Sequence, residues 1–204
     1  LVRGGEASAP PRQHSYEVPE ELCCAGAGKP DFMIWNEIVR EPRGGALVGL
    51  VFARKTIGEH GFRSYQRRLH LLRVPREDGG APVPVLDAPL SGMVDQPVCR
   101  SVEDQRARPD ACMDRFYFST LFTLVPEIAP VEPANLIMIA TARTSPGRRT
   151  RTKGPVPRGA IERTTDDDAR DPLCSYTRSY YFDEASGRYL PDAPLPDCSD
   201  HLEP

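Results

Sequence analysis

The chain lacks any apolar stretch long enough to form a transmembrane helix. Its longest apolar segments, residues 116–125 and 136–142, have the length of β-strands, whereas a membrane-spanning helix needs about 20 apolar residues. The chain also lacks a large excess of charge, because 29 acidic and 26 basic residues give a net charge of −3. Such a balance provides no overall field that would attract nucleic acid. These absences argue against a transmembrane segment and against a nucleic-acid partner.

The short motifs of common catalytic and cofactor chemistry are absent too. The sequence has no G-x-S-x-G, H-E-x-x-H, C-x-x-C, P-loop or G-x-G-x-x-G pattern. We therefore assign no catalytic residue, expect no cofactor and favour a protein without enzymatic activity. The alternative is a hydrolase whose site assembles in space around a histidine. His60, beside Glu59 in a turn, and His70, within a strand, are its candidate bases.

No metal site is expected from the cysteines or from the acidic residues. Zinc sites are typically built from closely spaced C-x2–4-C pairs, which this chain does not contain. The acidic run 166–168 lacks the D-x-D-x-D-G spacing that places ligands around calcium. We therefore predict no metal ligands.

Proline is abundant, with 22 of 204 residues, about twice its average usage. Because proline lacks a backbone N–H and breaks helix interiors, this composition argues against a helical bundle. It suits short strands joined by many turns. Lysine is rare among the basic residues, which we interpret as the coding bias of a GC-rich bacterium.

Apolar and alternating segments predict the strands. In residues 116–125, Phe116, Phe118 and Phe122 fall on one face, which indicates a strand over a core. Residues 136–142 are apolar enough to form a buried strand, and residues 174–190 form a hairpin whose turn contains Gly187 at a positive φ. The remaining predicted strands are residues 32–39, 46–55 and 63–74, the last with a short helix as its alternative. The best helix candidate is residues 99–110.

These elements predict a mainly β fold, a single antiparallel sandwich or curved sheet with one short helix and Pro-rich extended arms. The β-rich domain spans residues 31–190 and contains irregular loops at 75–98 and 143–173. An extended N-terminal arm, residues 1–30, precedes it. An extended C-terminal tail, residues 191–204, follows it.

Six cysteines, an even number in a loop-rich chain, favour disulfides and an oxidising compartment. They are Cys23, Cys24, Cys99, Cys112, Cys174 and Cys198. Proximity along the chain favours the pairs 99–112 and 174–198. Residues 23 and 24 then form either a strained ring with each other or links that tie the N-terminal arm to distant cysteines, and we favour the links.

Basic residues are densest in residues 142–163, where seven stand against one acid. Arginine suits anionic groups, but the absence of aromatic residues in this segment disfavours binding of single-stranded nucleic acid. The acidic run 166–168 can neutralise the segment, so a self-paired loop is the alternative interpretation. Tyr181, expected on the outward face of its strand, is a further contact candidate. The predicted partner-binding residues are Arg148, Arg149, Arg151, Lys153 and Tyr181.

The function predicted from these features is that of a non-catalytic binding or accessory protein acting through protein–protein contacts, as a subunit of a larger assembly. We expect it to be secreted or periplasmic, and its first residue, Leu1, is compatible with a processed N-terminus. An enzyme inhibitor or a small-ligand-binding module is one alternative, and the hydrolase described above is the other.

Overall fold

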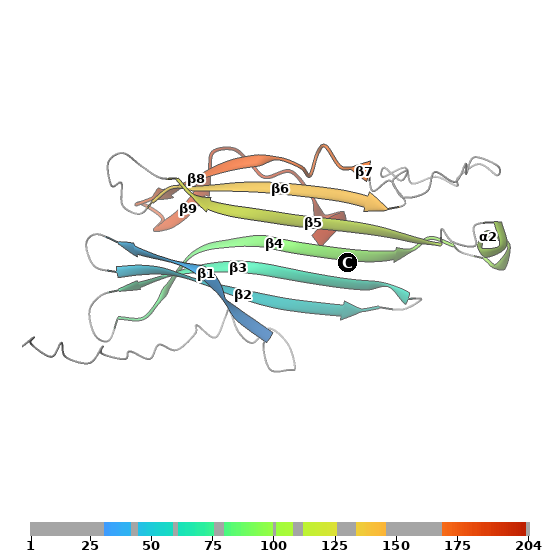
Figure 1. Ribbon diagram of the computed structural model, residues 1–204, viewed down its shortest axis with the longest axis horizontal. Coiled ribbons are helices and arrows are strands. Elements are labelled where there is room, and N and C mark those ends of the chain that lie inside the picture. Colours follow the sequence, from blue (N-terminus) through green and yellow to red (C-terminus); the bar gives the residue numbers. More distant parts are fainter. Residues whose placement is uncertain are drawn as a thin grey trace, which may run out of the picture.

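The computed structural model is mainly β, and its strands form one antiparallel sheet. The strand order is β1-β2-β3-β4-β5-β6-β8-β9, with β7 beside β6 (Figure 1). The strands are β1 (Asp31–Glu41), β2 (Gly45–Ile57), β3 (Arg63–Pro75), β4 (Val83–Pro97), β5 (Met113–Leu124), β6 (Leu136–Ser145), β7 (Ala169–Arg170), β8 (Thr177–Asp183) and β9 (Arg188–Pro191), and the helices are α2 (Val102–Ala107) and α3 (Ser199–Leu202). The structure describes residues 31–41, 45–58, 61–75, 80–99, 101–107, 112–125, 134–145 and 169–202.

Most of the predicted elements are confirmed. Residues 63–74 form a strand and not the alternative helix, and the helix expected at 99–110 is present as the six-residue α2. The terminal hairpin is β8 and β9, with Gly187 at a φ of 67° in its turn. Phe118 and Phe122 point into the core from β5, as their alternation predicts. The mainly antiparallel β fold with one sheet is therefore correct.

The prediction of an irregular connection at 75–98 is wrong, because most of it is the 15-residue strand β4. Its prolines mislead because they usually interrupt central strands. Pro84 and Pro89 lie in the part of β4 that pairs only with β3, so one edge there needs no ladder hydrogen bonds. Each proline also adjoins a register shift, where β4 inserts one extra residue, Val85 or Leu90. A half-free edge and two bulges thus accommodate both prolines.

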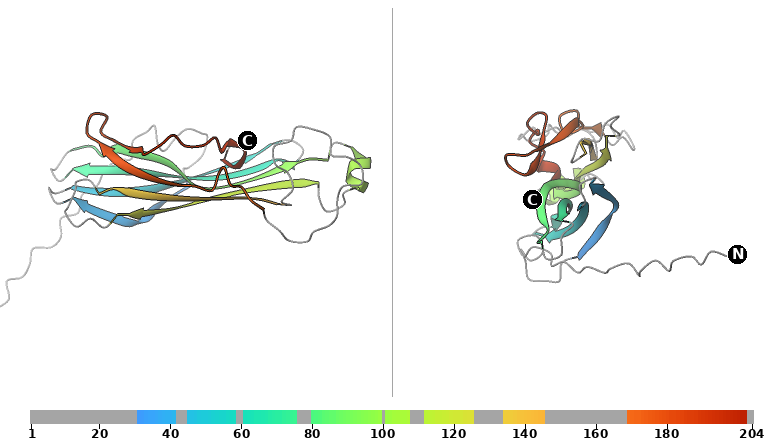
Figure 2. Two further views of the ribbon diagram at one scale, coloured as in Figure 1. Left: turned by 90° about the horizontal axis from the view of Figure 1, so that it is seen from above. Right: turned by 90° about the vertical axis from the view of Figure 1, so that its left-hand side faces the viewer.

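The sheet divides into two halves that meet at the β4–β5 pair. These strands pair only between residues 91–97 and 113–119, and they converge toward the end that carries α2 (Figure 1). Where the ladder stops, the Thr120 hydroxyl lies 2.9 Å from the carbonyl oxygen of Pro89 and 3.1 Å from that of Leu90. Viewed end-on, the strands follow a curved path from β1 to β9 (Figure 2). This curvature brings the two halves together.

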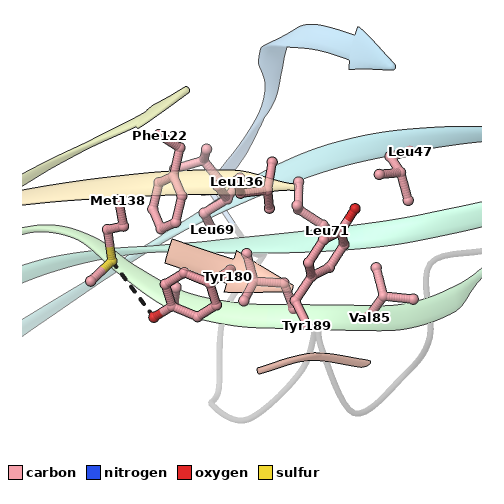
Figure 3. Packing of buried hydrophobic residues seen from close by; sticks show 12 residues of the cluster. Leu47, Leu69, Leu71, Val85, Phe122, Leu136, Met138, Tyr180 and Tyr189 are labelled. Carbon is pink, nitrogen blue, oxygen red and sulfur yellow. Dashed lines mark hydrogen bonds between the residues drawn. The ribbon is translucent and has the colours of Figure 1, made fainter. Parts of the chain in front are cut away.

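The main core fills the space between the two halves. Figure 3 shows Leu69 and Leu71 of β3 near Phe122 of β5 and the hairpin tyrosines, Tyr180 and Tyr189. The Tyr180 hydroxyl lies 3.8 Å from the Met138 sulfur, and burial of this side chain raises the pKa of its hydroxyl to about 12. The hairpin therefore closes the core opposite β3.

A second, smaller core lies beneath the C-terminal segment. Cys174 and Cys198 pack with Phe118 of β5 and with two alanines of β6. The tail is extended only in part, since α3 forms a helical turn against β4 and β5. Gly92 of β4 makes room for this turn, because a Cβ there would lie 2.5 Å from the carbonyl oxygen of His201. The predicted extended tail, residues 191–204, therefore contains a docked helical turn at residues 199–202.

Strand β6 is buried on one face rather than on both. Leu136 and Met138 are buried, whereas Ile139 on the opposite face is 44% exposed. The predicted buried strand at 136–142 is therefore present and is buried on its inner face. Within the described residues, no helix is long and apolar enough to cross a membrane.

Candidate functional site

The end of the sheet where β4 and β5 pair carries a band of basic side chains on one face. Directly paired residues of neighbouring strands point to the same side of a sheet, so the register defines rows across the strands. The middle row crosses six strands and consists of Lys55, Tyr65, Met93, Tyr117, Arg143 and Arg170. With strands about 4.8 Å apart, it is roughly 24 Å long.

The two flanking rows add more positive charge to the same face. One carries Arg63, Asp95 and Arg115, and the other carries Arg67. We define the cationic face as the six basic residues of these three rows: Lys55, Arg63, Arg67, Arg115, Arg143 and Arg170. Lys55, Arg63, Arg115, Arg143 and Arg170 are exposed, and Arg67 is half-buried.

The alternation of β3 explains how basic and core residues share one face of a strand. Arg63, Tyr65 and Arg67 have the same parity as Leu69 and Leu71. The leucines are buried where the two halves separate and enclose the core. The basic residues lie in the part of the sheet where β4 and β5 are paired. The same face is thus core at one end and exposed, cationic surface at the other.

Between β2 and β7, the three rows of the cationic face contain one carboxylate, Asp95, and Asp31 of β1 pairs with Ala53 at the β1 end of the Arg67 row. Asp95 is buried and paired with Arg115, whose Nε lies 2.6 Å from Asp95 Oδ1. Hydrogen bonds to Asp95 and to the Tyr117 hydroxyl, together with the Asp95 charge, raise the pKa of Arg115 above its ordinary value. Asp95 therefore offsets one of the six positive charges, and it also orients that arginine.

Two features of the described residues favour binding of an anion by the other basic side chains. Arg67 stacks over the Tyr65 ring at 5.3 Å and donates a 2.6 Å hydrogen bond from Nε to the Tyr65 hydroxyl, which holds the guanidinium in place. Arg143 lies directly opposite Arg170 in the β6–β7 ladder. Like charges in directly opposed positions destabilise a sheet. An anion bound between them would relieve this repulsion.

A second cluster of polar residues lies beneath the C-terminal tail. His201 Nε2 is 2.9 Å from Asp171 Oδ2, and Asp171 Oδ1 accepts hydrogen bonds from the backbone N–H groups of Leu173 and Cys174. Burial raises the pKa of Asp171, but the hydrogen bonds from His201, Cys174 and Leu173 outweigh burial and leave it below its ordinary value. His201 is 1% exposed. This geometry holds the tail and gives no access to a substrate.

The ligand atoms of Asp171, Cys174 and His201 lie within 4.8 Å of one another, a spacing that could hold a metal ion. Cys174 is bonded to Cys198, however, so its sulfur is not a thiolate. Metal ligation by cysteine requires the thiolate. With the disulfide formed, this cluster is a structural clasp between the tail and the β7–β8 connection.

His70, a candidate base of the hydrolase alternative, lies on β3 next to Asp87 and Arg68. Its Nδ1 is 3.7 Å from Asp87 Oδ1 and has no hydrogen-bond partner among the described residues, while Arg68 Nε lies 2.8 Å from the same oxygen. Burial lowers the pKa of His70, partly opposed by the Asp87 charge and assisted by Arg68. Asp87 thus pairs with an arginine and does not orient the imidazole.

The structure brings together four of the six cysteines. Cys99 is bonded to Cys112, and Cys174 to Cys198, as their proximity in the chain predicts. Tyr181 is 51% exposed, as expected for the outward face of β8. Cys23, Cys24, His60, Arg148, Arg149, Arg151 and Lys153 lie outside the described residues.

Sequence reasoning missed the cationic face. The signal was present in β3, where Arg63, Tyr65 and Arg67 alternate with Ser64 and Gln66. No strand contributes more than two of the six basic residues, so they are scattered along the chain. The face becomes visible only when the register aligns the strands.

Comparison with known proteins gives no relative. No protein-family model, no curated protein and no solved structure matches the chain.

Proposed function

We propose that this protein is a non-catalytic binding or accessory protein that holds an acidic protein partner on its cationic face. The observation that carries the proposal is the set of three adjacent rows, which contain six basic residues and one carboxylate between β2 and β7. Arginine forks pair well with carboxylates, and complementary charge steers and selects partners. Tyr65 and Tyr117 add rigid amphipathic contact area within the middle row.

The proposal includes an oxidising compartment, secreted or periplasmic. The bonds Cys99–Cys112 and Cys174–Cys198 support it, because disulfides persist outside reducing cell compartments. Membership of a larger assembly remains part of the same proposal, since an acidic subunit could occupy the face permanently.

Binding of fluorescent poly-L-glutamate at several salt concentrations tests the proposal. We expect binding at low salt that weakens as salt rises, because exposed charges are screened. The variant Lys55→Glu should weaken binding by roughly threefold or more. Arg54→Glu is the matched control: Arg54 is exposed and adjacent to Lys55, but it points to the other side of β2.

The control variant should retain the affinity of the wild-type protein. Absence of polyglutamate binding at low salt, or equal weakening by Arg54→Glu, would contradict the proposal. Stronger binding of duplex DNA than of polyglutamate at equal salt would assign the face to nucleic acid instead.

A further inference from the structure

The outer side of β5, β6, β8 and β9 carries apolar side chains that nothing in the described structure covers. Leu121 is 61% exposed, Ile139 44%, Tyr181 51% and Leu190 47%. Leu121 pairs directly with Ile139, and Tyr181 pairs with Leu190. We define these four residues and the half-buried Ile137 as the apolar patch.

The inner positions of the same strands are apolar as well. Phe122, Met138 and Tyr180 point into the main core from β5, β6 and β8 (Figure 3). Antiparallel strands with one solvated face normally alternate apolar and polar residues, and strands covered on both faces do not. The sequence around Ile139 therefore has the pattern of a doubly covered strand, although the described residues cover only its inner face. Exposed apolar patches of this kind mark interaction surfaces.

The apolar patch is continuous with the cationic face. Along β5, the outward residues run from Arg115 and Tyr117 through Ser119 to Leu121. The outward residues of β6 run in parallel from Arg143 through Thr141 to Ile139. Tyr117 and Leu121 are four residues apart, or about 13 Å. One partner could therefore contact both regions.

We propose that the occupant of this surface is an acidic polypeptide that also carries apolar side chains, lying along β5 and β6. This inference rests on the proposed function and specifies the chemistry of the partner. The carboxylates of the polypeptide pair with the cationic face, and its apolar side chains cover the apolar patch. The core-and-rim composition of protein interfaces, with buried aromatic and aliphatic groups beside arginines, matches this arrangement.

A polypeptide fits the apolar patch better than a lipid surface does. Hydroxyl groups lie between the apolar side chains, because Ile139 pairs with Thr177, and Ile137 pairs with Thr123 and Ser179. Hydrocarbon would leave these hydroxyls without hydrogen-bond partners, at a cost. A polypeptide can supply backbone or side-chain partners to each of them.

The test compares two labelled polymers of equal length and similar charge, poly-L-glutamate and a random copolymer of glutamate and tyrosine. We expect the copolymer to bind the wild-type protein about tenfold more tightly, the gain expected from burial of an apolar side chain. Leu121→Ser/Ile139→Thr should reduce the copolymer to the affinity of polyglutamate and leave polyglutamate binding unchanged. Val102→Ser, at an exposed apolar residue of α2, is the control and should change neither.

The outcomes separate this inference from the proposed function. If the wild-type protein binds neither polymer at low salt, the proposed function is overturned. Equal affinity for the two polymers, with no effect of Leu121→Ser/Ile139→Thr, overturns the further inference alone. Vesicles of equal parts phosphatidylglycerol and phosphatidylcholine provide the remaining arm. Binding to them that depends on Leu121 and Ile139 would assign the patch to a membrane surface and overturn the polypeptide.

Discussion

His201 Nε2 lies 2.9 Å from Asp171 Oδ2, so the last helical turn of the described chain is hydrogen-bonded to the connection between β7 and β8. The Cys174–Cys198 bond lies beside this pair. The two links act on the same segment, one covalent and one polar. Together they hold α3 over Gly92 and the β4–β5 end of the sheet.

Asp171→Ala should lower the free energy of unfolding by about 2 kcal/mol at pH 7, because it removes the acceptor of three hydrogen bonds. Since the folded-state pKa of Asp171 is lowered, the charge stabilises the fold above its unfolded pKa of about 3.9. This stabilisation is lost as the pH falls through the folded-state pKa. Urea denaturation at pH 7 and at pH 3 checks this. If the free energies of unfolding of wild type and variant differed more at pH 3 than at pH 7, the predicted role of the Asp171 charge would be contradicted.

Cys174→Ser/Cys198→Ser should destabilise the protein by about 3 kcal/mol, the loop-entropy expectation for this separation of 24 residues. It should also make the tail accessible to proteases. Cys99→Ser/Cys112→Ser removes a bond that closes a shorter loop, with a separation of 13, around α2. That variant should lose less free energy of unfolding, and its tail should remain protected from proteases. Denaturation compares the stabilities of the two variants, and limited proteolysis compares the accessibility of their tails. Equal cleavage of the tail in both variants would contradict the proposal that the Cys174–Cys198 bond holds the tail in place.

Gly92→Ala should destabilise the fold by about 2 kcal/mol, because the new Cβ would clash with the His201 carbonyl oxygen at 2.5 Å. Gly187→Ala is the comparison. No atom lies within 4 Å of a Cβ built there, so its expected cost of about 1 kcal/mol arises from the φ of 67° alone. Thermal denaturation shows which of the two variants is less stable, and we expect Gly92→Ala to unfold at the lower temperature. Proteolysis should detect a released tail in Gly92→Ala only.

Asp95→Asn should separate stability from binding. Removing the carboxylate charge weakens the contact with Arg115 and should cost about 1 kcal/mol of stability. The cationic face then gains a net positive charge, so polyglutamate should bind more tightly at low salt. Measuring denaturation and binding on the same preparation checks both. A parallel loss of stability and affinity would show that Asp95 serves the site only by supporting its fold.

Local patterns account for much of the predicted fold. Alternation of Phe116, Phe118 and Phe122 predicts one strand and its inner face. The turn chemistry of residues 183–187 predicts the hairpin, because Gly187 readily adopts a positive φ. The disulfides 99–112 and 174–198 follow from short separations along the chain. All these features depend on residues that are close in sequence.

The sequence by itself determined the mainly β class, the local strands and the two short-range disulfides. Tertiary structure alone decided that Pro84 and Pro89 belong to a strand. A strand accommodates these prolines only where one of its edges is unpaired, and this depends on how β4 pairs with β3 and β5. Tertiary structure also decided the cationic face, whose Lys55 and Arg170 stand 115 positions apart in the chain and five strands apart in the sheet. Strand register is a long-range property, set by how the two halves of the sheet pack on one core. Local patterns carry no information about it.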